Sequence, residues 1–98
     1  MDDAALARLL RDISAIEQTL EANNLPGPNE YAVKRLRSLS TLLDHANGYF
    51  AGKCTELLEL AEGFYSETGS SIFPGGAPYH HAVMLDLVNR MHRHADRL

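Results

Sequence analysis

Histidine is concentrated near the C-terminal end of the sequence, where it raises the question of a metal site. Four of the five histidines lie in one segment: His80, His81, His92 and His94. Imidazole is a common zinc ligand. If the segment is one helix, His81 and His92 stand about 16 Å apart along its axis. One helix therefore cannot close these two side chains on a single ion, and a zinc site would need further donors.

Two arrangements could supply such donors. His92 and Asp96 are spaced i, i+4 and share one face of a helix. An antiparallel pairing of two copies near Asp86 would also bring His81 of one chain beside His92 of the other. The candidate metal ligands are therefore His81, His92 and Asp96. The alternative is that these imidazoles pack at the edge of a helical interface and form local hydrogen bonds.

His45 suggests a different chemistry, because an exposed histidine on a helix can accept a phosphoryl group. Histidine phosphotransfer domains use such a residue in a helical bundle and follow it with a basic residue and a glycine. Here Ala46, Asn47 and Gly48 follow. The sequence departs from that pattern, so phosphotransfer through His45 is a third hypothesis beside an ordinary surface histidine.

The remaining reactive side chains indicate no catalytic constellation. Cys54 falls on an apolar stripe, as a buried thiol would, and the serines have no evident base. Enzymatic activity is therefore left open, with a non-catalytic role favoured. Arg90, Arg93 and Arg97 lie opposite the apolar stripe of the last helix. They either keep that helix soluble and complement its dipole, or form an anion-binding patch.

Apolar spacing predicts that helices carry these residues. Leu6, Leu9, Leu10, Ile13, Ile16 and Leu20 share one face of a helix over 4–23, which Asp2 and Asp3 can cap. Pro26 and Gly27 interrupt the chain, and Asn29 can cap the next helix. A loop rich in Gly, Ser and Pro covers 67–77. The last helix is predicted over 78–96, beginning at Pro78.

The segment between these helices carries apolar residues at alternating steps of three and four, a heptad-like seam typical of a coiled coil. The seam continues in phase through Asn47 and Gly48. It favours one central helix over 30–66, about 55 Å long. The alternative is a break near Asn47-Gly48, which would turn three helices into four.

Composition narrows the partners and the location. The chain has 98 residues, which suits one domain over 1–98. Its formal net charge of -4 does not favour binding to nucleic acid. No apolar stretch approaches the roughly 20 residues that a membrane span needs. With a single cysteine and an acidic N-terminal region, the sequence predicts a soluble cytoplasmic protein.

These observations predict an all-α helical bundle that acts as a protein-protein interaction module, such as an adaptor, chaperone or regulator, and forms a homodimer. The predicted interface residues are Leu39, Leu43, Phe50, Leu57 and Phe64 on the central helix, and Met84, Leu87 and Met91 on the last. A metal- or small-ligand-binding protein that uses His81, His92 and Asp96 is the alternative. No cofactor is expected unless zinc binds there.

Overall fold

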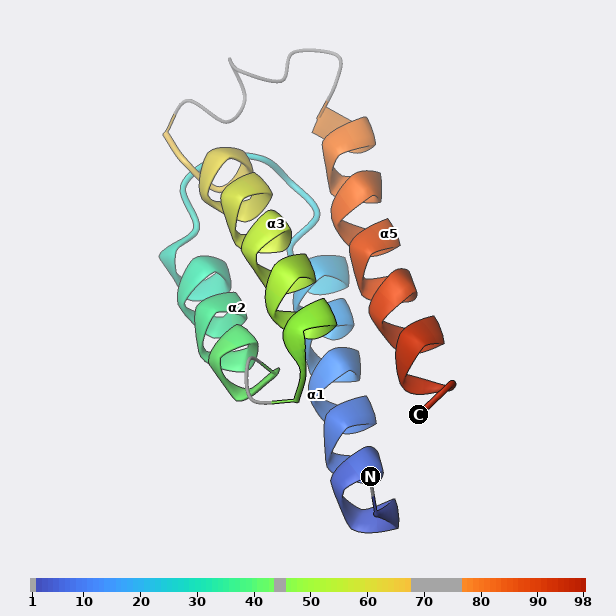
Figure 1. The fold of residues 1–98 in the computed structure, drawn as a ribbon. Coiled ribbons are helices and arrows are strands. Elements are labelled where there is room, and N and C mark those ends of the chain that lie inside the picture. The colour runs from blue at the N-terminus through green and yellow to red at the C-terminus, as the bar shows by residue number, and fades with distance from the viewer. Residues whose placement is uncertain (1, 44–45, 68–76) are drawn as a thin grey trace.

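The computed structural model describes residues 2–43, 46–67 and 77–98, and these residues form four helices (Figure 1). The helices are α1 (Asp3–Ala22), α2 (Glu30–Leu43), α3 (Gly48–Phe64) and α5 (Ala77–Ala95). Neighbouring helices run in opposite directions, and each packs against two others in the cyclic order α1, α2, α3, α5. The all-α prediction is confirmed, and the described part of the chain is an antiparallel bundle.

The continuous central helix predicted over 30–66 is wrong, because the chain breaks near Asn47-Gly48. Helix α2 ends before Asn47, and α3 begins at Gly48. The Oδ1 atom of Asn47 accepts hydrogen bonds from the backbone N–H groups of Tyr49 (2.9 Å) and Phe50 (3.2 Å). This side chain caps the new helix. Helices α2 and α3 bury their apolar residues in one shared core. The heptad-like spacing of these residues therefore continues across the break although the helix does not.

Side-chain caps also mark the starts of α1 and α2. The Asp2 carboxylate accepts a hydrogen bond of 2.7 Å from the backbone N–H of Ala5, and Asn29 Oδ1 accepts one of 3.0 Å from Ala32. The observed α1 and α5 boundaries differ by one residue from the ranges 4–23 and 78–96 expected from the sequence.

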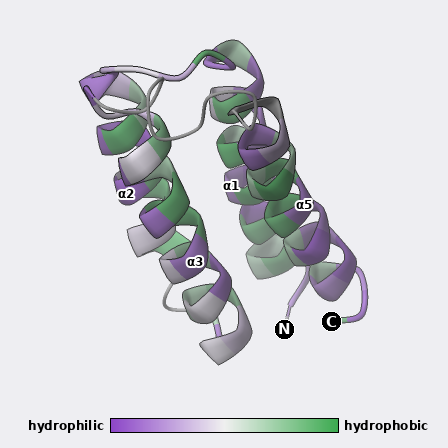
Figure 2. Cartoon of the chain, turned by 90° about the horizontal axis from the view of Figure 1, so that it is seen from above, coloured by the Kyte–Doolittle hydropathy of each residue, from purple (hydrophilic) through white to green (hydrophobic). Residues whose placement is uncertain are grey.

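Apolar residues of all four helices meet along the axis of a bundle that measures 45 × 21 × 21 Å. Figure 2, the view from above, shows α2 and α3 as one pair and α1 and α5 as the other. From α1, the core takes Leu9, Ile13, Ile16 and Leu20, and from α3 it takes Cys54 among others. Within the described residues, no helix is long and apolar enough to cross a membrane.

Ser40 and Thr19 are the buried polar residues in the described part of the chain, and Ser40 is the less exposed of the two. Ser40 is buried on α2, and its Oγ has no hydrogen-bond partner among the described residues. Because an unsatisfied buried hydroxyl is unfavourable and alanine is a better helix former, we expect Ser40→Ala to raise the free energy of unfolding by about 1 kcal/mol. Urea denaturation measures the change. The exposed Ser38→Ala on the same helix should shift it by less than about 0.5 kcal/mol, and a destabilised Ser40→Ala would contradict this account.

The end of α3 is joined to the turn between α1 and α2 by several hydrogen bonds. The Tyr65 hydroxyl donates to the Asn23 carbonyl at 2.6 Å, and the backbone N–H of Gly27 donates to the Phe64 carbonyl at 2.9 Å. Gly27 has a φ of 122°, a conformation that suits glycine. Burial disfavours the charged phenolate and raises the pKa of Tyr65 to about 12.

Candidate functional site

The opposite end of the bundle, where α3 begins and α5 ends, carries a pocket of about 300 Å³. We call it the arginine pocket; it is lined by Tyr49, Arg90, Arg93, His94 and Arg97. Because α3 and α5 are antiparallel neighbours, the first turn of one lies beside the last turns of the other (Figure 1). Residues more than forty positions apart in the sequence are thereby brought together.

Aromatic stacking between the two helices forms one wall of the pocket. The Tyr49 and His94 rings are stacked, with centroids 4.0 Å apart and an interplanar angle of 11°. The Phe50 ring meets His94 edge-on, with a centroid distance of 5.3 Å. Since Phe50 belongs to the core, the stack connects the pocket to a rigid part of the bundle.

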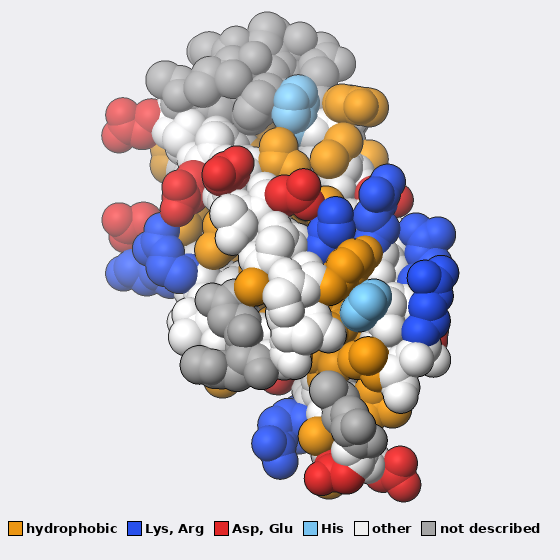
Figure 3. Space-filling view, in the orientation of Figure 1, with side chains coloured by type: hydrophobic (Ala, Val, Ile, Leu, Met, Phe, Trp, Pro, Cys, Tyr) orange, Lys and Arg blue, Asp and Glu red, His pale blue; other side chains and the backbone are white. Residues whose placement is uncertain are grey.

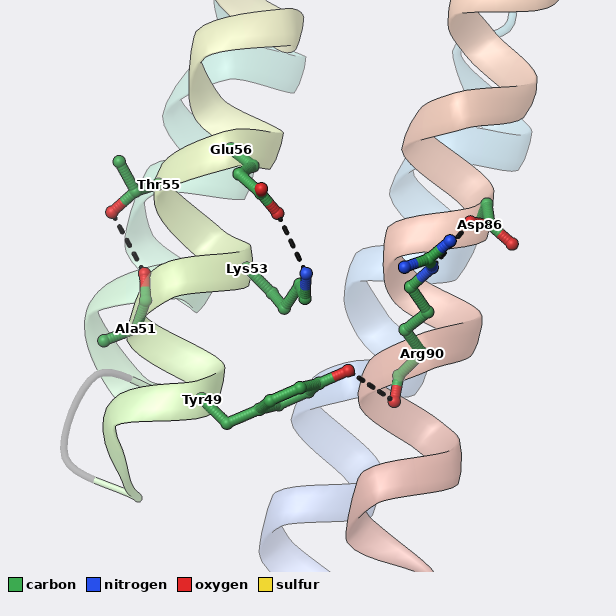
Figure 4. A network of polar contacts seen from close by, with 7 residues as sticks. All are labelled: Tyr49, Ala51, Lys53, Thr55, Glu56, Asp86 and Arg90. Atoms are coloured by element: carbon green, nitrogen blue, oxygen red, sulfur yellow. Dashed lines mark hydrogen bonds and ion pairs between the residues drawn. The ribbon is translucent and has the colours of Figure 1, made fainter.

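Tyr49 also makes polar contacts across the two helices (Figure 4). Its hydroxyl lies 3.5 Å from the Arg90 carbonyl oxygen, a long hydrogen bond. The Lys53 ammonium group lies over the Tyr49 ring, 5.5 Å from its centroid. The Tyr49 ring therefore contacts both His94 and Lys53, and the residue remains 36% exposed.

The three arginines of the pocket differ in their partners. Arg90 Nε forms an ion pair of 2.8 Å with Asp86 on the same helix, which leaves its terminal nitrogens for other contacts. Arg93 and Arg97 are exposed, and none of the acidic side chains that the structure describes forms an ion pair with either. Arg93 lies in the last turn of α5 and Arg97 lies just after its end at Ala95, and both side chains are exposed to solvent.

Positive charge is therefore concentrated locally on a chain whose formal net charge is -4. In the space-filling view of Figure 3, the largest group of Lys and Arg side chains lies at the right of this face, and smaller groups lie at the left and near the bottom. Lys53 is paired with Glu56 and Arg90 with Asp86, so near the pocket the positive charges outside these ion pairs are those of Arg93 and Arg97. Such a cluster attracts a compact anion.

The predicted metal ligands do not meet in the structure. His81 Nε2 lies 2.7 Å from the carbonyl oxygen of Leu20, so this nitrogen carries a proton and donates. His92 Nε2 lies 3.3 Å from Glu17 Oε2 on α1, and Asp96 is exposed. No group of three His, Cys, Asp or Glu side chains that could hold a metal is found among the described residues. Zinc binding remains an untested prediction.

The predicted interface residues are all in the core of a single chain: Leu39, Leu43, Phe50, Leu57, Phe64, Met84, Leu87 and Met91. The most exposed of them, Leu87, has 8% of its surface accessible. The spacing of apolar residues predicted which helix faces are buried. Each of these faces packs against other helices of the same chain. Self-association therefore remains a prediction, and it would require residues other than these eight.

The phosphotransfer hypothesis cannot be placed on the fold, because His45 lies outside the described residues. Cys54 is buried as its position on the seam indicated.

The arginine pocket was only partly visible in the sequence. The arginines Arg90, Arg93 and Arg97 were recognised there as an anion-patch alternative, whereas Tyr49 and Lys53 were missed. Once the break at Asn47 is known, the first turn of α3 must lie beside the last turns of α5, and this places Tyr49 near His94. Tyr49 could not be placed near His94 from the sequence because the central segment was predicted to be one continuous helix.

Comparison of this chain with protein families, with characterised proteins and with solved structures finds no match, so its function must be argued from the chemistry of the site.

Proposed function

We propose that the protein is a non-catalytic helical module that binds a partner protein, and that the arginine pocket holds a negatively charged group of that partner. One observation carries this proposal. Arg93 and Arg97 are exposed without an acidic partner among the described residues, beside the Tyr49–His94 stack. Guanidinium groups in this situation are suited to forked hydrogen bonds with a carboxylate or phosphate.

The pocket favours binding over catalysis. Arginine and lysine side chains supply only hydrogen-bond donors and positive charge. His94 packs against both the Tyr49 and the Phe50 ring, which holds its orientation and suits it to shape the wall of the pocket. Such an arrangement positions an anion and presents no evident nucleophile to it.

A protein partner fits this face better than nucleic acid. Single-stranded nucleic acid is commonly bound by stacking its bases on aromatic rings, and the Tyr49 ring is already stacked against His94. Glu56 and Asp86 lie close to the pocket and would repel an extended run of phosphates. We place the module in the cytoplasm, where a lone buried thiol such as Cys54 stays reduced.

Fluorescence anisotropy with a labelled glutamate-rich peptide tests the proposal. We expect saturable binding that weakens as sodium chloride rises from about 50 to about 300 mM, because salt screens exposed charges. Arg93→Gln/Arg97→Gln should weaken binding about tenfold or more, since one charge-assisted contact contributes about 1.5–3 kcal/mol. Both residues are exposed, so the variant should fold, and circular dichroism checks this.

The matched control is Arg8→Gln/Arg11→Gln, which removes the same charge from exposed positions on α1. It should leave the affinity within about twofold of the unaltered protein, because these residues lie outside the pocket. Equal losses in both double variants would show an effect of net charge alone and would contradict a pocket at Arg93 and Arg97. Absence of binding to the peptide would overturn the proposed function.

A further inference from the structure

The number of unpaired charges in the arginine pocket bears on which anion it takes. Arg93 and Arg97 carry like charges at the C-terminal end of α5, and these charges repel each other in the absence of an anion. A carboxylate carries one negative charge and neutralises one of them. A phosphate monoester carries about -1.5 to -2 at neutral pH, which matches both.

The hydrogen-bonding capacity of the pocket points the same way. One guanidinium fork occupies two of the about four acceptor sites of a carboxylate. Arg90 lines the pocket together with Arg93 and Arg97. Its ion pair with Asp86 is made by Nε, so its two terminal nitrogens can also donate hydrogen bonds to an anion. Three guanidinium groups lining one pocket offer more donors than a carboxylate can accept, whereas a phosphate monoester presents three terminal oxygens.

The surroundings of the pocket limit what can carry the phosphate. The Tyr49 ring already stacks against His94 and lies under the Lys53 ammonium group, so a nucleotide base would compete with these contacts. A volume of about 300 Å³ is at the lower limit of small-ligand sites and suits the end of a protruding side chain. Acidic side chains near the pocket, such as Glu56 beside Lys53 (Figure 4), would be repelled by an anionic lipid surface.

From this geometry we propose that the arginine pocket binds the phosphate group of a phosphorylated serine or threonine side chain in the partner protein. The inference rests on the proposed function and specifies the anion. Phosphorylation of the partner then switches its binding on, because the unmodified hydroxyl has no charge to pair with Arg93 and Arg97. Arg90 contributes its terminal nitrogens to the phosphate oxygens while its Nε keeps the ion pair with Asp86.

Three peptides that differ at one central residue test this inference. The residue is phosphoserine, glutamate or serine in an otherwise identical sequence of glycine, serine and aspartate, and anisotropy gives each affinity. We expect phosphoserine to bind about tenfold more tightly than glutamate, and glutamate more tightly than serine. Arg93→Gln/Arg97→Gln should remove the preference for phosphoserine, and Arg8→Gln/Arg11→Gln should keep it.

The outcomes separate the inference from the proposed function. Equal binding of the phosphoserine and glutamate peptides would overturn the inference that the pocket prefers a phosphate group. The proposal that it binds an acidic group of a partner protein would still hold. Absence of binding to either charged peptide would overturn both. A preference that survives in Arg93→Gln/Arg97→Gln would place the phosphate elsewhere. Co-sedimentation measures binding to phosphatidylcholine vesicles that contain a phosphatidylinositol phosphate. Binding to these vesicles that is tighter than binding to the phosphoserine peptide would overturn the inference that a protein carries the phosphate.

Discussion

Phe64→Ala is expected to lower the free energy of unfolding by about 3–5 kcal/mol, the range for a buried phenylalanine truncated in a closed core. Phe64 is fully buried, and its ring contacts Tyr65 edge-on and lies near His81. A domain of this size is commonly stable by only about 5–15 kcal/mol. Urea denaturation followed by circular dichroism should therefore show a much lower midpoint, and the variant should be partly unfolded near 37 °C.

The same variant separates a core role for Phe64 from the interface role that the sequence suggested. If Phe64 lay between two chains, the variant would dissociate at unchanged helical content, and light scattering would show a smaller mass. The exposed aromatic Tyr31 provides the control, since Tyr31→Ala should change stability by less than about 0.5 kcal/mol. A stably folded Phe64→Ala with reduced mass would contradict the single-chain core.

Alkaline pH should destabilise the bundle through Tyr65. Burial raises the pKa of its hydroxyl from 10.0 to about 12 in the folded protein. The stabilisation is therefore complete below pH 10 and is lost as the pH rises from 10 to 12, because the unfolded chain loses the proton first. The two-unit difference sets an upper limit of about 2.7 kcal/mol. Solvent screening reduces the expected loss to about 2 kcal/mol.

Tyr65→Phe is the variant that isolates this effect, because it keeps the ring and removes the hydroxyl that donates to Asn23. At neutral pH it should be less stable than the unaltered protein by about 1 kcal/mol. The difference should shrink and then reverse as the pH rises from 10 to 12. Ultraviolet titration should show a phenol that ionises near pH 12 only when Tyr65 is present. A constant difference between the proteins across this range would contradict the assignment.

Much of the fold could be predicted from the sequence because buried positions follow helical spacing. The stripe of Leu9, Ile13, Ile16 and Leu20 on α1 is buried where the pattern placed it. Periodicity reports which face of a helix is covered, since apolar side chains avoid water whatever covers them. Periodicity does not show whether the surface that covers a helix face belongs to the same chain or to another chain. The eight predicted interface residues are an example, because other helices of the same chain bury them.

The break between α2 and α3 could not be recovered from periodicity. Two antiparallel helices that bury their stripes in one core can keep the pattern in phase across a short connection. The deciding feature was local: Asn47 accepts hydrogen bonds from the first N–H groups of α3, and Gly48 follows it. Asparagine is a strong N-cap, so greater weight on capping would have favoured the break.

The arginine pocket could not be predicted without the break between α2 and α3. The arginines of α5 could be identified as a cationic group from spacing alone, but their significance lies in what faces them. Tyr49 reaches His94 only because α3 restarts beside the end of α5. The histidines predicted to bind metal instead contact α1: His81 lies against the Leu20 carbonyl, and His92 against Glu17.

The most direct test of the arginine pocket is an NMR titration that observes the side-chain Nε–Hε groups of the arginines as the glutamate-rich peptide is added. The proposal predicts saturable shifts for Arg93 and Arg97, with one shared dissociation constant, and little change for Arg8 and Arg11 on α1. Small, uniform shifts across all the arginines that do not saturate would contradict it. They would show that the peptide meets only the overall charge of the protein.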